Sequence, residues 1–144
     1  MSEITQYPKR IHLLGSGRHE EATAGGAITP GMLLKVNSVG QVIAHDGAAG
    51  VAEKAFALED ALQGRTINTA YAQNELVGFV LASPGDVVYA FLGGGENVNP
   101  GATLNSNGDG TLQAGTTNAI AIALEAVNAS DSNNVNERIR VRIL

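Results

Sequence analysis

Apolar and polar residues alternate along this chain in short runs that Gly and Pro separate. Met32, Leu34 and Val36 are spaced two residues apart, which is the pattern of a half-buried strand. The runs ELVGFVL (75–81) and DVVYAFL (86–92) are rich in β-branched and aromatic residues and give the strongest strand signal. These runs predict a protein built from short strands.

The last eight residues, ERIRVRIL, form another such run. Arg138, Arg140 and Arg142 share one face of the predicted strand, and apolar residues occupy the other. We therefore expect an amphipathic strand with a charged face.

Pro-Gly pairs mark three predicted corners, at residues 30–31, 84–85 and 100–101. Pro fixes φ for the second position of a tight turn, and Gly supplies the positive φ that a type II turn needs next. Two of the corners open similar segments, Ile28–Ala44 and Val98–Ala114, in which two short runs flank a Gly-centred turn. Each segment predicts a hairpin.

Two stretches combine helix-favouring composition with strand-like alternation, and we interpret both as strands. In residues 51–62 we expect a strand through Leu58, then a turn or short helical loop from Glu59 to Gly64. In residues 119–127 the apolar residues alternate with Ala. The chain then has nine or ten strands and less than about a fifth of its residues in helix. This predicts an all-β fold, a small Gly-rich β-barrel or β-sandwich with Pro-Gly corners.

Residues 1–27 are polar and Gly-rich, with one short apolar patch at Ile11–Leu14. They predict an extended N-terminal arm with at most one short strand near Arg10–Leu14. Residues 28–144 are expected to form a single β domain.

Composition narrows the classes of function. A net charge of −5 with only three lysines argues against nucleic acid as a partner. The sequence contains no Cys, which excludes disulfides and thiolate chemistry. It has no apolar run long enough to span a membrane and no signal peptide at its start, so we expect a soluble protein made in a cytoplasm, with no membrane partner.

Candidate chemistry is sparse. The histidines at positions 12, 19 and 45 lack metal-site spacing, and the adjacent carboxylates of RHEE (18–21) would point to opposite faces of a strand. The segment that begins NSNGDG at Asn105 lacks the first and twelfth ligands of a calcium loop. LGSGR (14–18) and LGGGE (92–96) lack the Lys or the third spaced Gly of phosphate-binding loops. We expect no enzyme, no metal and no cofactor.

The segments AGGAITPGMLLKV, AFALEDALQGRTINTAY and ASPGDVVYAFL occur in an order that resembles the capsid decoration, or cement, proteins of tailed bacteriophages. The resemblance covers roughly Gly25 to Leu124. It implies a β-rich protein on the virion, outside an expanded icosahedral capsid, with the major capsid protein as its partner. It also implies a homotrimer, with a homodimer as the alternative, and capsid contacts made by an N-terminal arm.

The arm has the composition of a segment that lies along a partner's surface. Its candidate contacts are Tyr7, Pro8, Arg10, Ile11 and His12. The face formed by Arg138, Arg140 and Arg142 is the alternative contact. Two other functions stay open: a carbohydrate- or receptor-binding β-module of a virion, and a small β-barrel enzyme.

Overall fold

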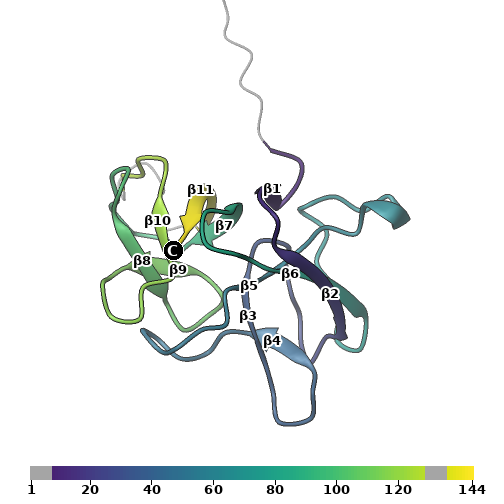
Figure 1. The fold of residues 1–144 in the computed structure, drawn as a ribbon. Helices are drawn as coiled ribbons and strands as arrows, with labels where there is room; N and C mark the ends of the chain where they lie inside the picture. The colour runs from purple at the N-terminus through teal and green to yellow at the C-terminus, as the bar shows by residue number, and fades with distance from the viewer. Residues whose placement is uncertain (1–7, 129–135) are drawn as a thin grey trace, which may run out of the picture.

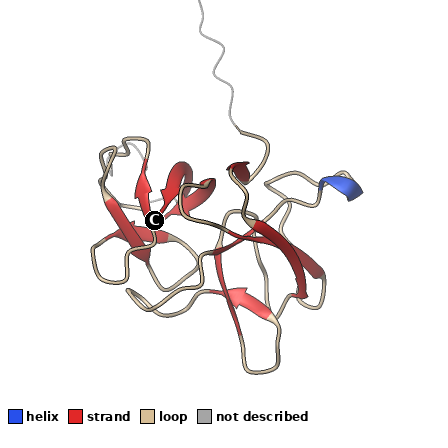
Figure 2. Ribbon diagram, viewed as in Figure 1, coloured by secondary structure: helices blue, strands red, loops and turns tan. Residues whose placement is uncertain are grey.

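The computed structural model describes residues 8–128 and 136–144. Strands and connecting loops make up nearly all of this part (Figures 1 and 2). The strands are β1 (His12–Leu14), β2 (Arg18–Thr23), β3 (Leu33–Val36), β4 (Val42–Ala44), β5 (Ala55–Ala57), β6 (Leu76–Leu81), β7 (Val87–Leu92), β8 (Thr103–Ser106), β9 (Leu112–Ala114), β10 (Ala121–Ala123) and β11 (Glu137–Ile143). One short 3-10 helix, η1 (Ala61–Gln63), lies in the loop between β5 and β6. The all-β prediction is confirmed.

The strands form two sheets that lie side by side, with β1 between them (Figure 1). One sheet has the order β2-β6-β5-β3-β4, and a parallel bridge between Ala24 and Val42 joins its two ends. The other has the order β1-β7-β11-β10-β8-β9, and a parallel pairing of Leu92 with Leu112 closes its last five strands into a ring. The prediction of a small β-barrel or β-sandwich is therefore confirmed, and the closed five-stranded ring is that of a barrel.

The two five-stranded rings repeat one arrangement. In chain order, β2 to β6 correspond to β7, β8, β9, β10 and β11, and the strands pair in the same order in both rings. The registers also agree: β3 pairs with β4 through Leu34 and Ala44, and β8 pairs with β9 through Leu104 and Ala114. We infer that the chain contains an internal structural duplication.

A shared core joins the rings. Its largest apolar cluster contains Leu33 and Phe56 from the first ring, Val88 and Ile139 from the second, and Ile11 from just before β1. All five side chains are at most 3% exposed. Burying one such side chain stabilises a fold by about 1.5–3 kcal/mol, so the junction contributes substantially to stability.

Most predicted elements are present. Both Pro-Gly segments fold into hairpins, β3–β4 and β8–β9, and β5 is followed by η1 as expected. The stretch 119–127 contains β10, although its buried side chains include Ala121 and Ala123, whereas Ile122 is only partly buried. The strands pack so closely at this point that the inner face of β10 accommodates the small side chains of Ala121 and Ala123, and the larger Ile122 lies on the outer face.

The prediction for residues 1–27 is wrong in its strand count. Two strands, β1 and β2, lie there, and β2 pairs with β6 along all six of its residues. Ile11 and Ala24 are fully buried. Residues 11–24 are therefore part of the folded body. The first seven residues of the expected arm, Met1–Tyr7, lie outside the described residues.

Candidate functional site: the Asp86 clamp and the predicted contact residues

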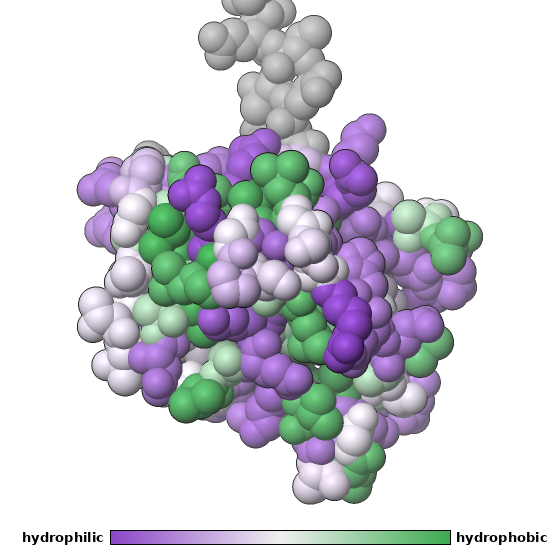
Figure 3. Space-filling model, viewed as in Figure 1, coloured by the Kyte–Doolittle hydropathy of each residue, from purple (hydrophilic) through white to green (hydrophobic). Residues whose placement is uncertain are grey.

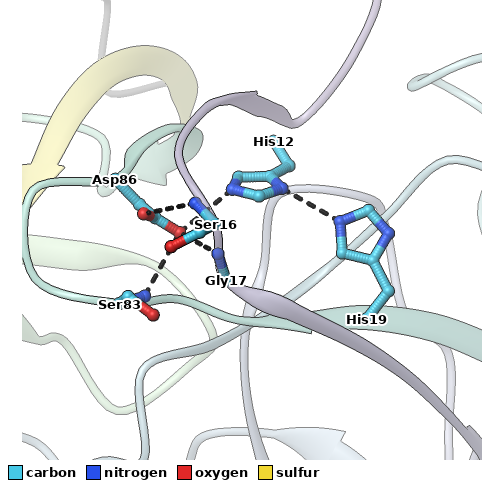
Figure 4. Close-up of polar contacts among 6 residues, drawn as sticks. All are labelled: His12, Ser16, Gly17, His19, Ser83 and Asp86. Atoms are coloured by element: carbon cyan, nitrogen blue, oxygen red, sulfur yellow. Dashed lines mark hydrogen bonds and ion pairs between the residues drawn. The ribbon is translucent and has the colours of Figure 1, made fainter.

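Asp86 is the most densely bonded carboxylate in the described part of the chain (Figure 4). It follows the Pro84-Gly85 corner directly before β7, and it is 2% exposed. Its oxygens accept hydrogen bonds from the backbone N–H groups of Ser16 (3.2 Å), Gly17 (2.9 Å) and Ser83 (3.2 Å). The corner between β6 and β7 thus holds the loop that joins β1 to β2. We call this arrangement the Asp86 clamp.

The loop can wrap around the carboxylate because it contains Gly15 and Gly17. A Cβ atom on Gly15 would lie 1.9 Å from Oδ1 of Asp86, and one on Gly17 would lie 2.5 Å from Oδ2. Gly15 also has a φ of +116°, which L side chains rarely adopt. The segment LGSGR does cradle an anion, and that anion is a side chain of the same protein.

His12 completes the clamp. Its Nε2 lies 3.0 Å from Oδ2 of Asp86, and its Nδ1 lies 2.9 Å from Nε2 of His19 (Figure 4). An ionised carboxylate can only accept, so Nε2 of His12 carries a proton. In neutral His12 the Nδ1 atom then accepts from His19. The ring centroids are 5.1 Å apart, which places the two nitrogens nearly on the line between the rings. The geometry is that of a hydrogen bond along the lone pair.

The clamp keeps its carboxylate charged. Burial raises the pKa of Asp86, but hydrogen bonds from the backbone N–H groups of Ser83 and Gly17 and from His12 together lower it by more than burial raises it. The pKa of Asp86 consequently lies below the ordinary value for Asp. A buried negative charge with several donors fixes β1, β2 and the β6–β7 corner relative to one another.

The row of Asp86, His12 and His19 resembles the base of a catalytic triad only in part. Both ring nitrogens of His12 have partners, so neither is available to a serine hydroxyl. His45 is buried and bonded to Ser106 Oγ (2.7 Å) and to the Val51 carbonyl (2.9 Å), so it ties the segment after β4 to the end of β8. Among the described residues, no three His, Cys, Asp or Glu side chains gather as a metal site.

The predicted contacts near the N-terminus differ in accessibility. Arg10 is exposed and Pro8 is partly buried, whereas Tyr7 lies outside the described residues. Ile11 is fully buried in the core, so it is not available to a partner's surface. His12 is held in the clamp. The structure therefore does not bring these residues together as one surface.

The predicted arginine face is also divided. Arg138 packs over the ring of Phe91, 4.4 Å from its centroid. Its guanidinium donates to the carbonyl oxygens of Pro30 and Ile67 and to Asn68 Oδ1. Burial lowers the pKa of Arg138, and this side chain is a brace between β11 and the first ring.

Arg140 and Arg142 are more accessible. Nη1 of Arg140 lies 3.5 Å from Oε1 of Glu125, in an ion pair open to solvent. Arg142 is exposed and has no acidic partner in the described part of the chain. Of the three predicted arginines, Arg142 is thus the best placed to meet a partner.

Exposed aliphatic side chains are spread over several loops and strand ends. The most exposed are Leu62, Val51, Val39 and Leu14. On the face shown in Figure 3, apolar and polar side chains are interspersed. No helix in the described residues is both long and apolar enough to cross a membrane. Compared with known proteins, the chain matches no family model and no curated sequence.

Proposed function

We propose that the chain is a structural protein of a tailed-bacteriophage virion, which binds the outside of an icosahedral capsid and stabilises the expanded shell. The observation that carries the proposal is the position of Pro8–Arg10. This segment leaves the body at β1, whose place the Asp86 clamp fixes, and Lys9 and Arg10 are exposed. The net charge of the chain is −5, so the adjacent positive charges of Lys9 and Arg10 contrast with an acidic protein.

A decoration protein needs a rigid body and an anchored contact segment. The joined rings and their common core supply the first, and the clamp supplies the second. A protein that binds the intact shell and not its separated subunits shifts the equilibrium toward the shell. Many copies, and a homotrimer in particular, would turn modest affinity at each site into strong overall binding. The partner is then the major capsid protein, and the location is the capsid exterior.

Co-sedimentation with expanded shells tests the proposal. Expanded shells are assembled from a tailed-phage major capsid protein, and occupancy is measured for the full chain and for a variant without residues 1–10. The deletion ends at Arg10 because removal through Leu14 would take away β1 and the buried Ile11. We expect the full chain to decorate and the deletion variant to lose occupancy while it stays folded.

A charge-reversal variant, Lys9→Glu with Arg10→Glu, separates charge from length. Full-length protein that never decorates expanded shells would contradict the proposed function. Decoration at undiminished occupancy by both variants would instead move the contact to another surface, with Arg142 as the next residue to replace.

A further inference from the structure

The outer edge of β2 lacks a partner strand among residues 8–128 and 136–144. One edge of β2 pairs with β6 from Arg18 to Thr23. On the other edge, backbone contacts begin only after the strand, where Ala24 bridges Val42 and Gly25 N–H donates to the Val42 carbonyl (2.8 Å). The edge is open upstream of that point.

Three residues of β2 point their backbone groups out of this edge. The Gly78 carbonyl accepts from Leu58 N–H (2.8 Å), so the backbone groups of Gly78 face β5. Glu21 lies opposite Gly78 in the antiparallel ladder. The two therefore form a pair that exchanges no hydrogen bonds, and the N–H and C=O of Glu21 point away from β6. His19 and Thr23, two positions away on either side, point the same way, and all three residues are exposed.

The duplicated ring shows the same edge with a strand on it. Tyr89 of β7 lies opposite Arg140, whose carbonyl accepts from Leu124 N–H (3.0 Å), as Gly78 accepts from Leu58. Tyr89 is thus the counterpart of Glu21. Its outward N–H donates to the Ile11 carbonyl (2.8 Å), because β1 lies along the edge of β7.

Charge decides what kind of strand fits β2. Antiparallel pairing of two copies of β2 centred on Glu21 would place two like charges directly opposite, which is destabilising. The β1 of a second copy is held on its own β7 and in its own clamp. His12 of β1 lies opposite Val88 of β7, and Val88 corresponds to Glu20 because Tyr89 corresponds to Glu21. A strand that pairs with β2 as β1 pairs with β7 would therefore place its counterpart of His12 opposite Glu20. Basic side chains at that place suit the carboxylates of Glu20 and Glu21, since the ion pair that Glu20 makes with Arg18 is open to solvent.

We propose that the outer edge of β2, His19–Thr23, is a docking site for an extended strand of another polypeptide that carries basic side chains. Binding adds the strand antiparallel to β2, through main-chain hydrogen bonds to His19, Glu21 and Thr23 and through ion pairs to Glu20 and Glu21. Sequence specificity comes from the charges, since the backbone bonds are common to all peptides.

The test uses the isotope-labelled full chain and a synthetic peptide with the sequence of Pro8–Leu14, PKRIHLL. Backbone amide shifts are followed by NMR during titration. We expect the shifts to centre on His19, Glu21 and Thr23, with a Kd below about 1 mM. A control peptide with Glu in place of the Lys and the Arg should bind at least about tenfold more weakly.

Three variants identify the edge. Glu21→Pro removes one outward N–H and leaves the ladder to β6 intact, so it should abolish the shifts, whereas Glu21→Ala keeps the N–H and should retain them. Glu20→Lys should reverse the preference between the two peptides, and it tests the site even if the Pro variant does not fold. The proposal is overturned by shifts confined to β7, by an absence of binding, or by an unchanged preference in Glu20→Lys.

Discussion

Gly31 and Gly101 occupy equivalent corners of the two rings. Each follows a Pro and has a positive φ, +98° and +92°. Each N–H donates 2.8 Å to the carbonyl of a buried alanine, Ala57 for Gly31 and Ala123 for Gly101. The Pro-Gly turn therefore has the same role in both rings. It reverses the chain, and its Gly N–H hydrogen-bonds the start of a hairpin to the neighbouring strand.

The Asp86 clamp should contribute strongly to stability. We expect Asp86→Asn to lower the free energy of unfolding by on the order of 2–4 kcal/mol, because it removes a buried charge paired with His12 and sets an amide against backbone donors. Urea denaturation measures the change. Glu20→Gln is the control, since Glu20 pairs with Arg18 in solvent and its loss should cost about 0–1 kcal/mol. Equal effects of the two substitutions would contradict this role of Asp86.

The clamp also predicts acid sensitivity. The folded pKa of Asp86 is lower than the ordinary value of about 3.9. A lowered folded pKa contributes stability that is present above the ordinary value and is lost as pH falls toward the folded one. Unfolding free energies measured from pH 7 downward should therefore decline below about pH 4, and Asp86→Asn should flatten part of that decline. A decline of the same size in the variant would show that other groups cause it.

Tyr71 predicts the alkaline limit. Burial raises the pKa of Tyr71 to about 12, and its hydroxyl donates to the Leu58 carbonyl (2.6 Å). A raised folded pKa means stability that is present below the unfolded value of about 10 and is lost as pH rises toward 12. We expect stability to fall across that window in the wild type and less steeply in Tyr71→Phe. Absorbance of tyrosinate, followed together with circular dichroism, should show one Tyr that ionises only as the fold is lost.

Much of the fold is predictable from the sequence. The hairpins follow from Pro-Gly corners and period-2 runs, as at Leu34 and Leu104, because local backbone chemistry determines them. The sequence does not predict β2, because RHEEAT carries almost no apolar signal. β2 is a largely exposed strand at the edge of its sheet, and its place depends on pairing with β6. A signal for the duplication was present in AFALE (55–59) and AIALE (121–125), which fall at equivalent strands β5 and β10.

The contact residues were harder to predict. The sequence predicts that Ile11 and Arg138 are exposed contacts. In the fold Ile11 is buried in the core, and the guanidinium of Arg138 is hydrogen-bonded to the first ring. The sequence places Asp86 at the start of a predicted strand and assigns it no contact, because its partners Ser16 and Gly17 are distant in sequence. Such long-range neighbours leave no periodic trace in a single chain.

The duplicated corners allow a matched pair of substitutions. Gly31→Ala and Gly101→Ala both place a side chain at positive φ, which costs about 1–2 kcal/mol for an L residue. Their surroundings differ: a Cβ on Gly31 would lie 3.0 Å from the Tyr89 carbonyl oxygen and 3.2 Å from Nε of Arg138, whereas one on Gly101 meets nothing within 4 Å. We therefore expect Gly31→Ala to be the more destabilising in urea denaturation.

The excess should depend on Arg138, because its Nε is one of the two atoms closest to the added Cβ and hydrogen bonds hold its guanidinium in place. In an Arg138→Ala background, which removes one of the two close contacts, the difference between Gly31→Ala and Gly101→Ala should shrink. An unchanged difference would assign the whole excess to the Tyr89 carbonyl. Equal destabilisation by the two glycine substitutions in the wild-type background would show that φ alone sets the cost, and that the first corner relaxes away from its neighbours without loss.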